Sequence, residues 1–547
     1  MKKKLYSLSA LLFLTVSSYA QFFDSTAYRG AFPKEGGYNW TEGWTNWDPD
    51  TVVYPNTTLT VEADITANTT WRASDVIFLK NKVYVTGNVT LTIEAGAVIR
   101  GDKATQGTLI ITKGSKIMAE GTAAKPIVFT SAKSVSDGRA AGDWGGLIVL
   151  GNGINNQGSS VIEGGLDPTK GSYGGSDNTE NSGVLKFIRI EYAGVAFEPD
   201  KEINSLTLGA VGSGTTIDYI QCTFGGDDSF EWYGGAVNCK HLISYRTTDD
   251  DFDTDFGYGG NVQYGLIVRD PKLSDQCTCS SSEGFESDND AAGSIKTPLT
   301  KAIFSNITSV GPLRGNLTAT LTNDKFERGV RIRRNSALSL YNSIIVDWEK
   351  GLYLDGSASI DNFTGDTAAV KGILLAGNGA DTSNSSSTSF TWANYSVNKN
   401  INISDATADV KFVNPHPDFE GTGDLTPDYR LKDGSPALTG AIWDTRTGTL
   451  NNTNNIKEIN SISSMVLSPN PSNGLTTLSI SLSKSEKVNV TLLDLTGKTV
   501  KNIATETILN NGRNELAINT TDLNSGIYLV TVNTTSGNMT LRLSVIK

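Results

Sequence analysis

A 22-residue spacing between similar short segments constrains the fold of this chain more than any other feature. The segment YIQC at 219–222 is followed at this interval by HLIS, and FEWY at 230–233 is followed by FDTD. The segments at 330–333 and 352–355 repeat the interval. Strand-like segments at one period, separated by Gly, Asn, Asp and Ser turns, predict coils that stack and bury a continuous core. We therefore expect a right-handed parallel β-helix, with loops inserted before Phe285 and Val330.

The composition favours an all-β protein. The chain has 56 Gly but only 15 Pro, and it is rich in Thr, Asn, Val and Ile, which suit strands and tight turns. Its formal net charge of -12 argues against nucleic acid as a partner, because phosphate binding needs clustered Lys and Arg. A cation or a neutral glycan suits such a surface better.

The N-terminus predicts export. Residues 1–20 combine three lysines, an apolar stretch from Leu5 to Val16 and a small-residue end at Ala20, which is the pattern of a secretory signal peptide. No later window approaches the length of a transmembrane helix, so we expect no transmembrane segment. In an exported protein, the four cysteines predict structural disulfides or buried thiols rather than a zinc site, and their pairing stays open: Cys222, Cys239, Cys277 and Cys279.

Composition changes divide the remaining chain into four segments. Residues 21–75 contain the aromatic run Tyr38, Trp40, Trp44 and Trp47, which we expect to cap the first coil, with a sugar-stacking platform as the alternative. The β-helix follows at 76–441. A polar linker at 442–464 leads to residues 465–547, whose short alternating runs predict a small antiparallel β-sandwich.

Two resemblances accompany this division. The segments at 91–99, 126–130 and 142–147 resemble the opening coils of surface β-helix proteins from Bacteroidetes, and 428–437 resembles the last coil of polysaccharide-lyase-like β-helices. The C-terminal domain resembles the type A sorting domain of type IX secretion cargo, in LSPNP at 467–471, LDLTGK at 493–498 and LNSGIYLV at 523–530. Its motif residues here are Pro469, Asn470, Pro471, Asp494, Gly497, Lys498, Gly526 and Tyr528.

The sorting-domain resemblance implies a route for the protein. It implies Sec export, recognition by the type IX outer-membrane machinery, and then removal of the domain by a sortase-like protease with anchoring at the surface, or release. The alternative is an ordinary β-sandwich binding module. The β-helix resemblance leaves function open, because that scaffold is shared by lyases, hydrolases, adhesins and passive spacers.

The predicted register places two columns of side chains on the outside of the helix. The first column is Glu231, Asp253, Glu286, Arg331 and Tyr353, and the second is Tyr233, Asp255, Asp288, Arg333 and Asp355. Phe230, Phe252, Phe285, Val330 and Leu352 would stack inside. Carboxylates on neighbouring coils repel one another, so the columns invite a cation or pairing with the nearby arginines. We expect calcium at Asp253, Asp255 and Asp288, with further carboxylates in the preceding turns at Asp227, Asp228 and 249–251.

Three functions remain compatible with these columns. The preferred one is a secreted or cell-surface protein that recognises an extracellular polymer such as polysaccharide. The second is a polysaccharide lyase or glycosidase, in which resemblance to β-helix lyases implies Arg331 or Arg333 as base, or in which Glu286 takes part as acid or base. The third is a passive adhesin or spacer, whose columns are solvated strand faces. The only two histidines, His241 and His416, make a His-activated nucleophile improbable, and the balance leans away from an enzyme.

Overall fold

The computed structural model describes residues 22–162, 164–195, 203–275, 281–315, 325–385, 390–419, 425–447, 462–482, 485–494, 498–534 and 538–547. The chain forms two compact units, residues 1–449 and 450–547. The predicted signal peptide, Cys277, Cys279, Gly497 and most of the predicted linker lie outside the described residues.

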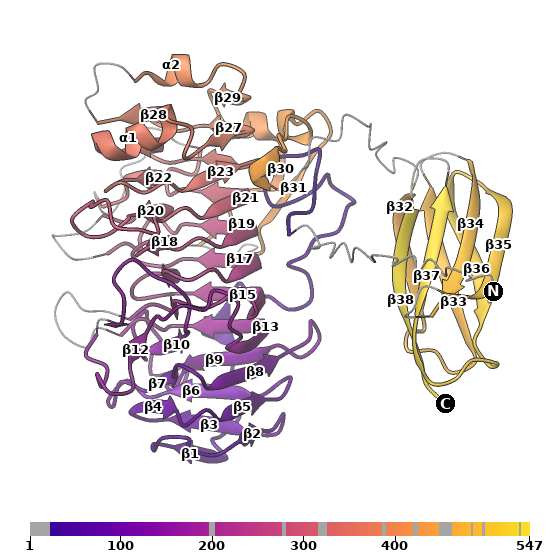
Figure 1. Cartoon of the computed structure of the whole chain (residues 1–547), viewed down its shortest axis with the longest axis horizontal. Helices are drawn as coiled ribbons and strands as arrows, with labels where there is room; N and C mark the ends of the chain where they lie inside the picture. The colour runs from indigo at the N-terminus through magenta and orange to yellow at the C-terminus, as the bar shows by residue number, and fades with distance from the viewer. Residues whose placement is uncertain are drawn as a thin grey trace, which may run out of the picture. The chain divides into compact units, whose positions relative to one another are not determined.

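The first unit is a stack of parallel β-strands that runs from β1 to β28 and β29 (Figure 1). One face is a ten-stranded sheet of β4 (Lys82–Val85), β7 (Thr108–Ile111), β10 (Gly146–Leu150), β14 (Leu206–Gly209), β16 (Phe230–Tyr233), β18 (Phe252–Asp255), β20 (Phe285–Ser287), β22 (Arg328–Ile332), β25 (Lys350–Leu354) and β28 (Ala380–Asn384). We call it the site sheet. Helices α1 (Ser357–Thr364) and α2 (Trp392–Tyr395) follow its last strands. This arrangement confirms the predicted parallel β-helix.

A seventeen-stranded sheet forms the other two faces of each coil. Its strands are β1 (Leu59–Val61), β2 (Thr69–Trp71), β3 (Val76–Leu79), β5 (Thr90–Ile93), β6 (Val98–Gly101), β8 (Lys116–Glu120), β9 (Ile127–Ser131), β13 (Gly183–Glu191), β15 (Thr216–Thr223), β17 (Asn238–Tyr245), β19 (Asn261–Val268), β21 (Ile303–Val310), β23 (Ser339–Tyr341), β24 (Ile344–Val346), β26 (Val370–Lys371), β27 (Ile373–Ala376) and β29 (Ile401–Ser404). Long strands such as β13 pair with β8 in their first half and with β9 in their second.

A bend in each long strand turns the chain from one of these faces to the other. The residue at the bend has a positive φ: 50° at Phe187, 58° at Tyr219, 52° at His241 and 63° at Tyr264. Bulky residues rarely adopt this left-handed conformation. Here the four rings stack across successive coils, with centroids 4.4, 4.2 and 5.0 Å apart, and this packing offsets the backbone strain. We call this row the ring stack.

The interior of the helix follows the predicted register. Phe230 pairs with Phe252, and Phe252 pairs with Phe285. Their ring centroids lie 5.5 and 5.1 Å apart inside the core, and Trp232 is fully buried beside them. Cys222 and Cys239 are buried free thiols on neighbouring strands, and burial raises the pKa of Cys239 to about 12. The structure therefore favours inert thiols over a disulfide at these two positions.

The aromatic N-terminal segment does not cap the first coil, contrary to the prediction. Residues 22–54, which we call the N-terminal strap, run along the flank of the helix. The Ala31 N–H donates to Thr308 Oγ1 (2.9 Å), the Asn46 N–H to Gln221 Oε1 (2.9 Å), and the Tyr54 hydroxyl to Glu191 Oε2 (2.8 Å). The first coil begins at β1, before residue 76, and its Trp71 is buried in the core.

The segment that resembles a last coil also lies on the flank. Residues 428–431 form β31 (Asp428–Leu431), which pairs antiparallel with β30 (Phe412–Asn414). The Leu431 N–H donates to the Pro33 carbonyl (3.0 Å), so this C-terminal strap, residues 412–447, lies beside the N-terminal one. The last parallel strand is β29, and the expectation that the helix extends to residue 441 is corrected accordingly.

The straps lie on the flank because the strands beneath them are apolar on both faces. Outward residues there include Tyr245, Leu266 and Val346, which pack with Phe32, Trp40, Trp44 and Trp47 of the N-terminal strap and with Tyr429 of the C-terminal strap. Trp44 is 2% exposed. A strand that is apolar on both sides needs a second covering layer, and the straps supply it.

The second unit is made of antiparallel strands in a three-stranded and a four-stranded sheet. They are β32 (Ile462–Ser468), β33 (Leu475–Leu482), β34 (Glu486–Leu493), β35 (Thr499–Leu509), β36 (Gly512–Asn519), β37 (Gly526–Thr534) and β38 (Asn538–Val545). Asn470 fixes the turn after β32, since its Nδ2 donates to the Arg542 carbonyl (2.8 Å) and its Oδ1 accepts from the Ser544 N–H (2.9 Å). Asp494 Oδ1 accepts from the Lys498 N–H (3.0 Å), and the Tyr528 hydroxyl donates to the Asn524 carbonyl (3.1 Å). No described helix is long and apolar enough to cross a membrane.

Candidate functional site

The site sheet brings the two predicted columns into register. Glu231 pairs with Asp253, Asp253 with Glu286, Glu286 with Arg331, and Arg331 with Tyr353. Tyr233 pairs with Asp255. The second column continues just past the strand ends, where the backbone N–H groups of Asp288, Arg333 and Asp355 donate to the neighbouring coil at 2.8–2.9 Å.

The columns are less exposed than strand faces usually are. Glu231, Tyr233 and Asp288 are buried. Tyr233 belongs to a small outer core with Leu150, Ile162, Leu166 and Tyr173. This core forms where the segment after β10 folds back over the site sheet. The segment includes a hairpin of β11 (Ser160–Val161) and β12 (Ser172–Tyr173). The Tyr233 ring is therefore a packing element, and it offers no free face to a ligand.

Arginines neutralise the half of the face that lies on β20, β22 and β25. Arg331 contacts Glu286 (3.2 Å) and Asp355 (2.9 Å), while Arg333 contacts Asp288 (2.8 Å) and Glu286. Burial lowers the pKa of both guanidiniums, but the net direction is upward, because Glu286 and Asp288 outweigh burial at Arg333, and Glu286, Glu283 and Asp355 outweigh it at Arg331. Both guanidiniums are held in the protonated state, which is the reverse of what a general base needs.

A second group of carboxylates lies on the half of the face formed by β16 and β18. One ligand oxygen from each of Asp228, Glu231 and Asp253 lies within 4.8 Å of the others, and the same is true of Asp227, Asp228 and Asp249. Asp253 Oδ1 is buried and has no hydrogen-bond partner among the described residues. Burial, and then the neighbouring carboxylates, raise the pKa of Asp228 and Asp253 well above the usual range.

The structure does not bring the predicted calcium ligands into one group. Asp288 is held by Arg333 and by Arg334 at 2.8 Å, and Asp255 accepts from the Phe256 N–H at 2.6 Å. Among the described residues, Asp253 instead groups with Asp228 and Glu231. The turn before β16 is thus part of the site. The sequence feature that indicates this is the acidic pair Asp227-Asp228, which recurs 22 positions later as Asp249-Asp250.

The carboxylate group fits a hard divalent cation. Calcium takes six to eight oxygen ligands and tolerates irregular geometry. Asp228, Glu231 and Asp253 supply carboxylate oxygens at the required closeness, and the unpartnered oxygen of Asp253 is the kind of atom that such an ion satisfies. Asp251 takes no part, because it lies inside the helix in a buried ion pair with Arg269 (2.8 Å).

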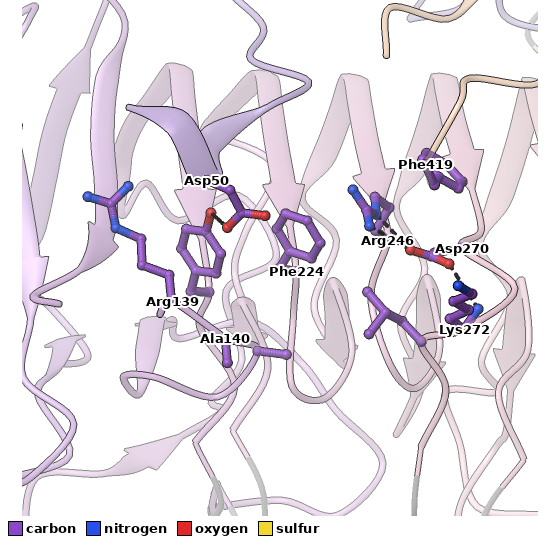
Figure 2. Close-up of a pocket in the computed structure, with 11 residues that line it drawn as sticks. Asp50, Arg139, Ala140, Phe224, Arg246, Asp270, Lys272 and Phe419 are labelled. Carbon is purple, nitrogen blue, oxygen red and sulfur yellow. Dashed lines mark hydrogen bonds and ion pairs between the residues drawn. The ribbon is translucent and has the colours of Figure 1, made fainter. Parts of the chain in front are cut away.

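A pocket of about 330 Å³ lies on the flank of the β-helix and is lined by aromatic rings and paired charged residues (Figure 2). Arg246 lies between the rings of Phe224 and Phe419, 4.5 and 4.6 Å from their centroids, and pairs with Asp270 at 2.7 Å. At the other end the Tyr192 hydroxyl donates to Asp50 (2.6 Å). Both carboxylates that line this pocket therefore already have a partner, and the pocket lies where Asp50 of the N-terminal strap and Phe419 of the C-terminal strap pack on the coils.

Comparison with known proteins supports two domains. The model of a pectate-lyase-like β-helix domain matches residues 63–414, and that of a secretion-system C-terminal sorting domain matches residues 467–547. The second match shows that the protein uses type IX secretion to reach the cell surface or the extracellular space, and that it meets that machinery.

No curated protein matches the chain. A solved structure that resembles it is the full-length tailspike protein 2 (TSP2, ORF211) of Escherichia coli O157:H7 bacteriophage CAB120, with 12% identity and a TM-score of 0.19. The likeness covers 86% of this chain and 64% of the tailspike, so the chain spans less than two thirds of that protein's length.

Proposed function

This chain belongs to the family of pectate-lyase-like β-helix domains, and on that premise we propose that its site sheet binds a divalent cation and, with it, an extracellular polysaccharide. The observation that carries the proposal is the buried Oδ1 atom of Asp253, which has no hydrogen-bond partner among the described residues. The carboxylates of Asp228 and Glu231 lie close to that of Asp253. Export by type IX secretion gives the protein access to polymers outside the cell.

The cation ligands in this proposal are Asp228, Glu231 and Asp253. Bound calcium would supply positive charge for the carboxylates and for an anionic group of the polymer. Along the same face, the ring of Tyr353 lies on the outer column, flanked by Arg328 (4.9 Å) and Lys350 (5.9 Å). Both cations already pair with carboxylates, Arg328 with Glu283 and Glu327 and Lys350 with Glu327, so this end of the face offers a sugar an aromatic ring rather than a free charge.

Titration calorimetry of the full chain with calcium tests the cation site. We expect binding by the wild type, and loss of binding after Asp253→Asn, which removes one ligand charge at nearly constant shape. Asp137→Asn is the matched control, because Asp137 is an exposed aspartate elsewhere on the β-helix. Equal calcium binding by all three proteins would contradict the assignment.

Polymer binding needs a separate measurement. We expect polygalacturonate or alginate to be retained on the protein in calcium and released by a chelator, whereas any retention of a neutral glucan should be the same in both conditions. If neither anionic polymer binds in calcium, the proposed recognition is wrong and the passive adhesin or spacer becomes the better description.

Cleavage of the bound polymer is a second candidate function, and one observation favours it. Burial raises the pKa of Glu286 to about 7, and this carboxyl lies next to Arg331 and Arg333 in the middle of the face. A carboxyl that titrates near neutral pH is suited to donate a proton to a glycosidic oxygen. New reducing ends that appear with the wild type but not with Glu286→Gln would support this function, and unchanged polymer length would exclude it for the polymers used.

A further inference from the structure

An aromatic hollow of about 240 Å³ lies on the flank, far from the site sheet in each coil, where the N-terminal strap crosses the ring stack. The strap contributes Asp24, Tyr28, Tyr38 and Trp40, and the ring stack contributes His241 and Tyr264. Most side chains in this region are fixed by packing. The Trp40 ring stacks on Phe32 (5.2 Å between centroids), and its Nε1 donates to the Ala31 carbonyl (2.9 Å). The walls of the hollow are therefore rigid.

Tyr38 differs from the other aromatic residues of the strap. It is 71% exposed, whereas Trp40, Trp44 and Trp47 are buried between the strap and the coils. The three tryptophans therefore do not form one exposed sugar-stacking platform, which was the alternative prediction for this segment. Of these four aromatic residues, Tyr38 is the exposed one, and it lines a hollow together with the rings of Trp40 and Tyr264.

The polar groups of the hollow suit a neutral ligand. The carboxylate of Asp24, 2.7 Å from the ammonium of Lys240, already has a counter-charge. His241 lies 5.2 Å from Trp40, and its Nδ1 is 2.8 Å from Asp218 Oδ1, which leaves Nε2 as the ring nitrogen for a ligand. An added cation would compete with Lys240 for Asp24. A polyol can instead accept from Lys240 and donate to Asp24 without disturbing their pair.

The size of the hollow limits the ligand to one ring. Sites for drug-sized molecules usually enclose about 300–1,000 Å³, and this one is smaller. A rigid aromatic wall, an exposed tyrosine ring and paired polar groups at the rim match the two sides of a pyranose, whose C–H faces are apolar and whose hydroxyls donate and accept. We propose that this hollow binds a single neutral pyranose residue without a metal ion.

Saturation-transfer NMR of the full chain in chelator tests the proposal, because the cation site plays no part under those conditions. The probes are the methyl glycosides of glucose, galactose and mannose, with tetramethylammonium chloride as the cationic competitor. We expect at least one glycoside to bind. Tyr38→Ala should weaken it about 2- to 10-fold through loss of the ring contact, and Asp24→Asn by about tenfold or more through loss of a charged acceptor.

Val53→Ala is the matched control, since Val53 lies on the same strap and is 84% exposed. Tyr38→Phe keeps the ring and should keep most of the affinity, which separates a ring contact from a general disturbance of the strap. The proposal is overturned if no glycoside binds, if binding survives both Tyr38→Ala and Asp24→Asn, or if tetramethylammonium displaces the sugar. A failure in chelator leaves the calcium-dependent function of the site sheet unaffected, so the two ideas fail separately.

Discussion

Replacing Asp253 by Asn should stabilise the β-helix when no divalent cation is present. Asp253 Oδ1 is buried without a described hydrogen-bond partner, and Glu231 and Glu286 pair with Asp253 from the coils on either side. An amide has nearly the same shape as the carboxylate but carries no charge. The substitution therefore removes a desolvation cost and a repulsion together, while the interior packing of β18 is unchanged.

The expected gain follows from the geometry. A buried polar atom that lacks a partner costs about 1–3 kcal/mol. Two ionised carboxylates within 4.8 Å of each other, such as those of Asp253 and Glu231, repel by about 3 kcal/mol at an effective dielectric constant of about 20. Because the acidic groups reduce this repulsion by taking up protons, we expect a net gain of about 2–4 kcal/mol near pH 8.

The gain should depend on pH with a definite sign. Burial and neighbouring carboxylates raise the pKa of Asp253 in the folded state above its ordinary value of 3.8. The folded protein then binds more protons than the unfolded chain, so stability without a cation is greatest below the unfolded pKa and falls as pH rises toward the raised one. The difference between wild type and Asp253→Asn should therefore vanish near pH 4 and increase toward pH 8.

Thermal unfolding of the full chain in chelator, at several pH values between 4 and 8, measures this difference. Asp137→Asn is the control, because the Asp137 carboxylate is exposed and accepts from Ser134. Calcium should raise the unfolding temperature of the wild type and of the control but not that of Asp253→Asn. A lower unfolding temperature for Asp253→Asn in chelator, or a difference that does not change with pH, would refute the reasoning.

Three further predictions concern the straps, the flank pocket and export. Trp44→Ala should cost about 3–5 kcal/mol and release the N-terminal strap, so limited proteolysis should cleave within residues 22–54 before the coils unfold. Arg246→Met should leave Asp270 buried without its counter-charge and cost about 3–5 kcal/mol by denaturant unfolding, and adding Asp270→Asn should recover most of that loss. Deletion of residues 465–547 should abolish surface display, with the β-helix accumulating in the periplasm on cell fractionation.

The register of the site sheet could be predicted from the sequence because inward aromatic residues and outward charged residues recur at matching positions of successive coils. Phe230, Phe252 and Phe285 recur at the inward position, and charged residues recur beside them. A shift by one residue would expose the aromatic column, so the pattern tolerates one alignment only. The insertions before Phe285 and Val330 left that constraint intact, and the predicted pairs across them are found.

The straps could not be predicted by the same reasoning, because outward residues were assumed to face solvent. In β17, β19 and β24 the second half of the strand is apolar on both faces, as in Leu242-Ile243 and Leu266-Ile267-Val268. Such runs signal a covering layer outside the coil. The tryptophans of residues 40–47 were the natural candidates for that layer, but their position before the first coil suggested an end cap.

Ion pairing differs along the site sheet, and this difference shapes what the face can bind. On β20, β22 and β25 each carboxylate discussed above has an arginine partner, as Glu286 and Asp288 do with Arg333. On β16 and β18 the carboxylates face one another. The oxygens of Asp228, Glu231 and Asp253 are therefore the part of the face suited to the proposed cation, and an exported β-helix meets dissolved cations outside the cell.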